Sequence, residues 1–69
     1  MIDNAKLKTI MESQVRWIHN RFGDKAVFSI VNSGEDYSVA KVKDRAWIDS
    51  YMHNNGSIAH DLIVDEKGS

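Results

Sequence analysis

The chain has 69 residues, of which 42% are hydrophobic and 28% charged, and its formal net charge is −1. A chain of this length forms one domain over residues 1–69 and leaves no room for a second hydrophobic core. Because it contains no cysteine, disulfide bonds and a thiolate zinc site are excluded. The near-zero charge gives no general attraction to nucleic acid.

A domain this small buries only about 60% of the surface that its unfolded chain exposes, so its stability is marginal. Disulfides, a structural metal or self-association usually compensate, and self-association is the remedy that the composition leaves open. The sequence has no basic segment followed by an apolar run at its N-terminus, and no apolar stretch of about 18 residues. We therefore expect a soluble cytoplasmic protein that does not bind membranes.

Hydrophobic side chains near the N-terminus recur at helical spacing, about 100° per residue, which predicts a long amphipathic helix over residues 2–22. Asp3 or Asn4 is expected to cap its start, because a short side-chain oxygen accepts hydrogen bonds from the free amides there. Gly23 is expected to end it in a left-handed conformation. The residues that share the hydrophobic face are Leu7, Met11, Val15, Ile18 and Phe22.

Two strands are predicted next. Residues 26–31 are rich in β-branched and aromatic side chains and apolar on both faces, which is typical of a central strand. Residues 37–43 are more polar, as expected of a strand with one solvent-exposed face. Residues 32–36 have turn chemistry and join the two strands into a hairpin.

The C-terminal third predicts a short second helix over residues 45–53, with Asp44 as its N-cap and residues 54–56 as its end. Residues 57–64 form a third predicted strand, and residues 65–69 a polar tail. The apolar positions of the predicted second helix are Trp47, Ile48, Tyr51 and Met52.

The elements follow the order α-β-β-α-β and predict a small single α+β domain. Its long amphipathic N-terminal helix, about 27 Å in length, packs on a three-stranded, mostly antiparallel sheet with the short second helix beside it. Either the second helix covers the opposite sheet face, or that face stays open to a partner or a second copy.

The residues that could carry catalysis are not arranged for it. His19, His53 and His60 have no pair at the spacing that places two ligands on one face of a helix or strand. His60 and Asp61 are neighbours, but on a strand their side chains point to opposite faces. The serines lack a recognisable nucleophile motif, and the only glycine of the turn at residues 32–36 is not followed by a helix. We therefore predict no catalytic residue, cofactor or metal, and no enzyme.

Aromatic and basic residues at the margins of the predicted hydrophobic faces are the best candidates for binding. Tryptophan and tyrosine are favoured interface anchors, although core packing is the alternative for each of them. Our leading hypothesis is a non-enzymatic protein-binding module of the inhibitor, adaptor, or phage or mobile-element accessory type, which docks onto another protein or forms a homodimer. The candidate partner-binding residues are Arg16, Trp17, Arg21, Trp47 and Tyr51.

The alternative hypothesis is a nucleic-acid-binding regulator. Lysines alternate along the predicted strand 37–43 beside an aromatic residue, Tyr37, an arrangement that can follow a phosphate backbone and stack bases. Lysines on a solvent-exposed or edge strand also prevent unwanted strand pairing, which explains them without nucleic acid. The candidate nucleic-acid-binding residues are Arg21, Lys41, Lys43 and Arg45.

Overall fold

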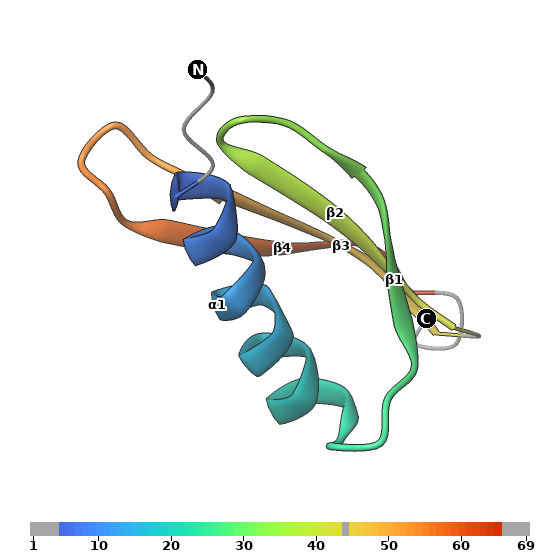
Figure 1. Cartoon of the computed structure of the whole chain (residues 1–69). Helices are drawn as coiled ribbons and strands as arrows, with labels where there is room; N and C mark the ends of the chain where they lie inside the picture. Colours follow the sequence, from blue (N-terminus) through green and yellow to red (C-terminus); the bar gives the residue numbers. More distant parts are fainter. Residues whose placement is uncertain (1–4, 44, 66–69) are drawn as a thin grey trace.

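The computed structural model describes residues 5–43 and 45–65. Among these residues, one helix is followed by four strands, which form a single antiparallel sheet with neighbours in chain order (Figure 1). Asp3, Asn4 and Asp44, the expected helix caps, and residues 66–69 of the expected tail lie outside the described residues. The elements are α1 Ala5–Phe22, β1 Phe28–Ser33, β2 Tyr37–Val42, β3 Ala46–Met52 and β4 Ile58–Asp65.

The predicted second helix over residues 45–53 is wrong, because this segment forms strand β3. Ala46, Ile48 and Ser50 are fully buried, whereas Trp47 and the residues that alternate with it are only half-buried. This period of two identifies a strand. The prediction considered only the large apolar side chains and so missed the small buried ones. The sheet therefore has four strands rather than three and no second helix lies beside it among the described residues, while the small α+β class and the N-terminal helix agree with the expectation.

Residues 54–56, expected to end the second helix, instead form the turn between β3 and β4. The amide of His53 donates to the Ser57 carbonyl at 2.8 Å, and the amide of Gly56 donates to the His53 carbonyl at 2.9 Å. Gly56 has a φ of 90°, a conformation that other residues adopt at a cost. A glycine preceded by asparagine occurs both at helix ends and in tight hairpins. Asn55 and Gly56 were therefore compatible with the predicted helix end as well as with the turn that forms.

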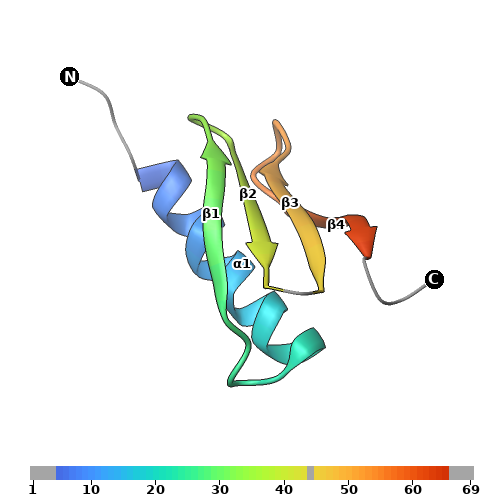
Figure 2. The ribbon, with the colours of Figure 1, turned by 90° about the vertical axis from the view of Figure 1, so that its right-hand side faces the viewer.

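Strand β1 is at an edge of the sheet and is not the central strand that its apolar sequence predicted. It pairs with β2 alone, and α1 lies against β2, β3 and β4 (Figure 2). Ile30 and Val31 are consequently 39% and 46% exposed. The register shifts between Ile30 and Asn32, a bulge that blunts the free edge.

Helix α1 covers one sheet face with a side that differs slightly from the predicted stripe. Its fully buried residues are Ile10, Gln14 and Ile18, at a spacing of four. Of the predicted stripe only Ile18 is fully buried, while Leu7 and its other members are half-buried at the margin. Gly23, with a φ of 104°, ends the helix as expected, and its amide donates to the His19 carbonyl at 3.0 Å.

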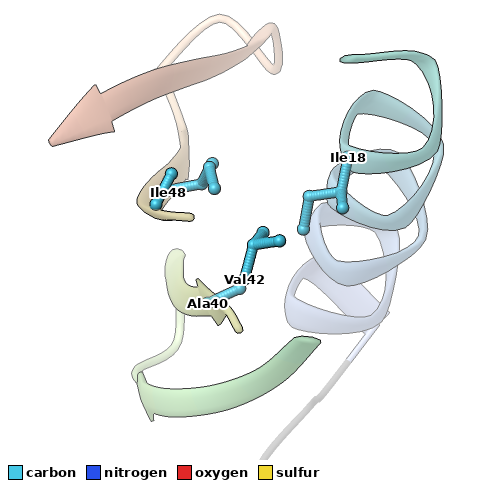
Figure 3. Close-up of a cluster of buried hydrophobic side chains, with 5 residues drawn as sticks. Ile18, Ala40, Val42 and Ile48 are labelled. Carbon is cyan, nitrogen blue, oxygen red and sulfur yellow. The ribbon is translucent and has the colours of Figure 1, made fainter. Parts of the chain in front are cut away.

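The hydrophobic core lies between α1 and the central strands. Ile18 points from the helix toward Ala40, Val42 and Ile48 of the sheet (Figure 3), and Ala46 completes this cluster. Trp17, Phe22, Ala26, Phe28 and Leu62 pack around it. Alanine at two of the positions beneath the helix lets the two layers approach closely. Within residues 5–43 and 45–65, no helix has the length and apolarity of a membrane span.

Candidate functional site

The candidate site is the sheet face opposite α1. Figures 1 and 2 show the helix on one side of the sheet, and no other described element lies over the other side. Successive strand residues point to opposite faces, and directly paired residues share a face. The residues that alternate with the buried ones therefore form a surface that we call the outer face. It consists of Tyr37, Val39, Lys41, Trp47, Asp49, Tyr51, Ala59, Asp61 and Val64.

Two side-chain contacts organise the outer face. Lys41 pairs with Trp47 across β2 and β3, and its ammonium lies 5.5 Å from the centroid of the indole ring, within cation–π distance. Tyr51 donates a hydrogen bond of 2.8 Å from its hydroxyl to Oδ2 of Asp61 on β4. The His53 ring meets that of Tyr51 edge-on at 5.2 Å. These contacts hold the two aromatic rings of β3 in place on the surface.

Two carboxylates face each other at the centre of this surface. Asp49 pairs with Asp61 across β3 and β4, an arrangement of like charges that destabilises a sheet. Burial, and secondly the negative charge of Asp61, raise the pKa of Asp49 above its usual value of 3.8. The hydrogen bond to Asp61, and secondly its charge, raise the pKa of Tyr51. Among the described residues, burial and Asp61 account for the shift at Asp49, so the outer face has an acidic centre.

A buried glutamine attaches the helix to the other face of the sheet. Gln14 donates from Nε2 to the carbonyl oxygens of Ser38 at 2.9 Å and Ile48 at 3.2 Å, and it accepts from Ser38 Oγ at 3.1 Å. Sequence reasoning missed this residue. Its position midway between Ile10 and Ile18, at a spacing of four, was the available signal.

His60 joins the helix to β3 and β4. Its Nε2 is 2.9 Å from Ser13 Oγ, its Nδ1 is 2.6 Å from Ser50 Oγ, and its ring stacks on Trp17 at 5.7 Å. Burial lowers the pKa of His60, and the charge of Asp61 partly opposes this shift. A histidine beside a serine can activate a nucleophile. Ser50 is fully buried, so a substrate cannot reach its hydroxyl, whereas Ser13 is half-buried. We interpret the network as a structural link between the helix and the sheet.

The candidate partner-binding residues do not form one surface. Trp47 and Tyr51 lie on the outer face, whereas Trp17 lies on the helix side of the sheet, stacked on His60. Arg16 and Arg21 are exposed on α1. The sheet separates the two groups, so a single flat partner cannot contact both.

The candidate nucleic-acid-binding residues gather around two adjoining hollows. The first, which we call the basic hollow, has a volume of about 420 Å³, and Arg21, Lys43 and Arg45 contribute to its lining. The second, which we call the apolar hollow, has about 220 Å³ and includes Lys41 and Phe28 in its lining. The guanidinium of Arg45 lies 5.7 Å from the centroid of the Phe22 ring, which also lines the basic hollow. The fold thus brings together cations from separate segments.

Among residues 5–43 and 45–65, no three histidine or acidic side chains are close enough to hold a metal ion. Comparisons with protein-family models, curated proteins and solved structures found no significant match to this chain.

Proposed function

We propose that this chain is a non-enzymatic protein-binding module that docks onto a partner protein through the outer face. The observation that supports the proposal is the absence of any described element over this face, although it has tryptophan and tyrosine side chains. Such residues dominate the energetics of protein interfaces. A surface that extends across three strands suits another protein better than a small molecule, which needs a concave site.

The acidic centre defines the chemistry of the partner. Asp49 and Asp61 face each other beside Tyr51 and Trp47. An arginine or lysine of the partner would neutralise the carboxylates and could stack on a neighbouring ring. Arginine fits better because its planar group binds carboxylates in a bidentate manner. We therefore propose a partner that presents an arginine within a flat, otherwise mostly apolar patch.

The mode of action follows from this surface. A module without catalytic residues acts by covering or bridging its partner, as inhibitors, adaptors and the accessory proteins of phages or mobile elements do. The absence of cysteine suits a reducing compartment, and we propose a cytoplasmic location on this basis.

The test begins with capture from the host lysate and identification of the bound protein by mass spectrometry. The partner is then purified, and its affinity is measured by calorimetry for the wild type and for D49N/D61N. This variant removes the two charges with almost no change in side-chain volume. We expect affinity to fall at least about tenfold. The control E12Q/D24N removes two exposed carboxylates elsewhere and should bind like the wild type.

A second variant, W47A/Y51A, tests the aromatic contribution. Loss of binding by a chain that circular dichroism shows to be folded supports docking through the outer face, with an expected loss of at least about 2 kcal/mol. A double-mutant cycle between Asp61 and the partner's arginine should give a coupling energy above about 1 kcal/mol. Unchanged affinity of D49N/D61N would overturn the proposal of a separate basic partner. A homodimer in light scattering that W47A/Y51A converts to a monomer would overturn it as well.

A further inference from the structure

Strand β1 has a free edge among the described strands. It pairs there with β2 alone, and it is the outermost strand of the sheet in Figure 2. The amide of Lys43 donates to the Val27 carbonyl at 2.9 Å, and hydrogen-bonded pairs alternate along an antiparallel ladder. Ser29 therefore forms the next hydrogen-bonded pair with β2. The backbone groups of Phe28 and Ile30 point away from β2, toward the free edge.

The first half of this edge lacks the features that usually prevent strand pairing, which are lysine, proline or a bulge. Residues 26–33 contain no charged residue and no proline. The bulge comes after Ile30, so Phe28–Ile30 is regular. Of the five large hydrophobic side chains that are exposed among the described residues, three belong to this segment, namely Val27, Ile30 and Val31. The edge is therefore both unprotected and apolar.

The core is incompletely closed on the helix side of β1. Phe28 and Ile30 pair with the buried residues Val42 and Ala40, so they lie on the helix face of the sheet. Helix α1 lies against β2, β3 and β4, and Ile30 stays 39% exposed. The ring of His19 meets that of Phe28 edge-on at 6.1 Å near the end of the helix. The core thus ends at β1 in an apolar margin.

Helix α1 extends this margin. Met11 and Val15 precede His19 at a spacing of four, so they lie on the side of the helix that faces β1. Both are half-buried. The opposite side of the helix is held by Trp17, which stacks on His60 of β4. Apolar surface from two elements is therefore left along the β1 side of the domain.

The β1 strand of a second copy complements this edge. In an antiparallel pair of β1 strands centred on Ser29, Phe28 of each copy faces Ile30 of the other. These are the residues whose backbone groups point to the free edge, and aromatic and β-branched side chains are favourable cross-strand partners. The same register places Val27 opposite Val31 of the other copy. Exposed apolar residues then cover one another, and no charges meet within residues 26–33.

Two-fold symmetry favours this pairing over a contact between the two different edges of the sheet. If β1 of one copy paired with β4 of the next, both end edges would stay free and the array would continue without closing. A pair of β1 strands uses the same edge of both copies and is closed.

We propose that this chain forms a symmetric dimer in which the β1 strands of two copies pair antiparallel about Ser29. The two four-stranded sheets join into one continuous sheet, with both helices on one side and both outer faces on the other. Self-association is a usual remedy for the marginal stability of a domain this small. The outer face stays open in this dimer, so the pairing goes beyond the proposed docking function and does not depend on it.

The first test combines light scattering and amide hydrogen exchange of the full chain over a range of concentrations. The mass should rise from that of one chain toward that of two. The amides of Phe28 and Ile30 should exchange at least about tenfold more slowly at concentrations where the dimer forms. The amide of Ser29 is the internal control, because it is bonded to β2 and should be protected at every concentration.

The second test fixes the register by disulfide cross-linking. The chain has no cysteine, so a single introduced thiol can cross-link only between copies. In the proposed register the two Ser29 Cα atoms are about 4.5 Å apart, within the range of a disulfide. Mild oxidation should therefore convert S29C to a covalent dimer. The control S33C, at another exposed position of β1, places its Cα atoms more than about 20 Å apart and should remain largely uncross-linked.

The third test places like charges at the symmetry axis. The variant S29K alters an exposed side chain and brings two lysines opposite each other in the dimer, so its dissociation constant should rise at least about fivefold. The control N54K adds the same charge at the exposed turn between β3 and β4 and should change the constant less than about twofold. Circular dichroism checks that both variants are folded.

Several results would overturn the proposal. One is the mass of a single chain at every concentration. Protection of Phe28 and Ile30 that does not depend on concentration would show that the same chain covers the edge. Equal cross-linking of S29C and S33C, or a dissociation constant unchanged in S29K, would place the interface elsewhere. The variants W47A/Y51A and D49N/D61N leave β1 unaltered and should dimerise like the wild type, so this proposal and the docking function can fail separately.

Discussion

Gln14 and Ser38 form a reciprocal pair in the protein interior. Ser38 Oγ donates to Gln14 Oε1 at 3.1 Å, while Gln14 Nε2 donates to the Ser38 carbonyl at 2.9 Å. Both residues are fully buried. A polar pair in a core this small is favourable only when each group is satisfied, and no described buried side-chain polar atom lacks a partner. The pair therefore specifies how α1 sits on the sheet.

We predict that Gln14→Ala lowers the free energy of unfolding by about 2–4 kcal/mol, because it creates a cavity and leaves the Ser38 hydroxyl without its acceptor. Urea denaturation measures the change. The control Glu12→Ala, on the exposed side of the same helix, should change stability by less than about 0.5 kcal/mol. A loss below about 1 kcal/mol for Gln14→Ala would contradict a central role for the pair.

Burial of His60 predicts a pH-dependent stability. Because its folded pKa is lowered from 6.5, the unfolded chain takes up a proton more readily than the folded chain. The stabilisation is fully present above about pH 6.5 and decreases as the pH falls from there toward the lowered folded pKa. The urea midpoint should therefore decrease as the pH is lowered from about 7.5 to about 5.5. This range covers about one pH unit on either side of the ordinary histidine pKa of 6.5.

The variant His60→Gln should be less stable at neutral pH, since it loses the stacking on Trp17, but it should show a flatter pH dependence over the same range. The exposed His53 provides the control, and His53→Gln should retain the wild-type slope. A slope that is unchanged in His60→Gln would assign the dependence to other groups.

Asp49→Asn should stabilise the protein at neutral pH by a few tenths of a kcal/mol, because it removes the like-charge pair with Asp61. The raised pKa of Asp49 means that wild-type stability decreases as the pH rises above about 3.8, and this contribution should be absent in the variant. Thermal unfolding at pH 4 and pH 7 measures both effects. The exposed Asp24 serves as the matched control, and equal stabilisation by Asp24→Asn would show an effect of net charge alone.

Ala40→Leu should destabilise the protein by about 1–3 kcal/mol, because the residue is fully buried beneath Ile18 and has no space for a larger side chain. The neighbouring Val39 points to the outer face, so Val39→Leu should cost less than about 0.5 kcal/mol. Guanidinium denaturation of both variants compares the two sheet faces directly. An equal loss of stability in Ala40→Leu and Val39→Leu would indicate that the outer face is buried as well.

Residue type alone identified some of the candidate binding residues but not how they are grouped in space. Sequence reasoning selected Trp47 and Tyr51 because their chemistry suits interfaces, and strand pairing places them on the outer face beside Asp61. It grouped them with Trp17, which lies on the other side of the sheet. It did not select Asp49, because a carboxylate in a predicted surface helix gives no signal. Only the β3–β4 register brings the two carboxylates together.

The sequence by itself determined the N-terminal helix and the turn chemistry around Gly23, because a hydrophobic pattern that persists over about five turns is unambiguous. It could not determine the state of residues 46–52. Their apolar residues, Trp47, Ile48, Tyr51 and Met52, fit either element over so short a stretch. Tertiary structure decided in favour of a strand, since β2 and β4 supply hydrogen-bond partners on both sides and small Ala46 and Ser50 let α1 approach. Such pairing depends on residues distant in the chain, which local periodicity does not report.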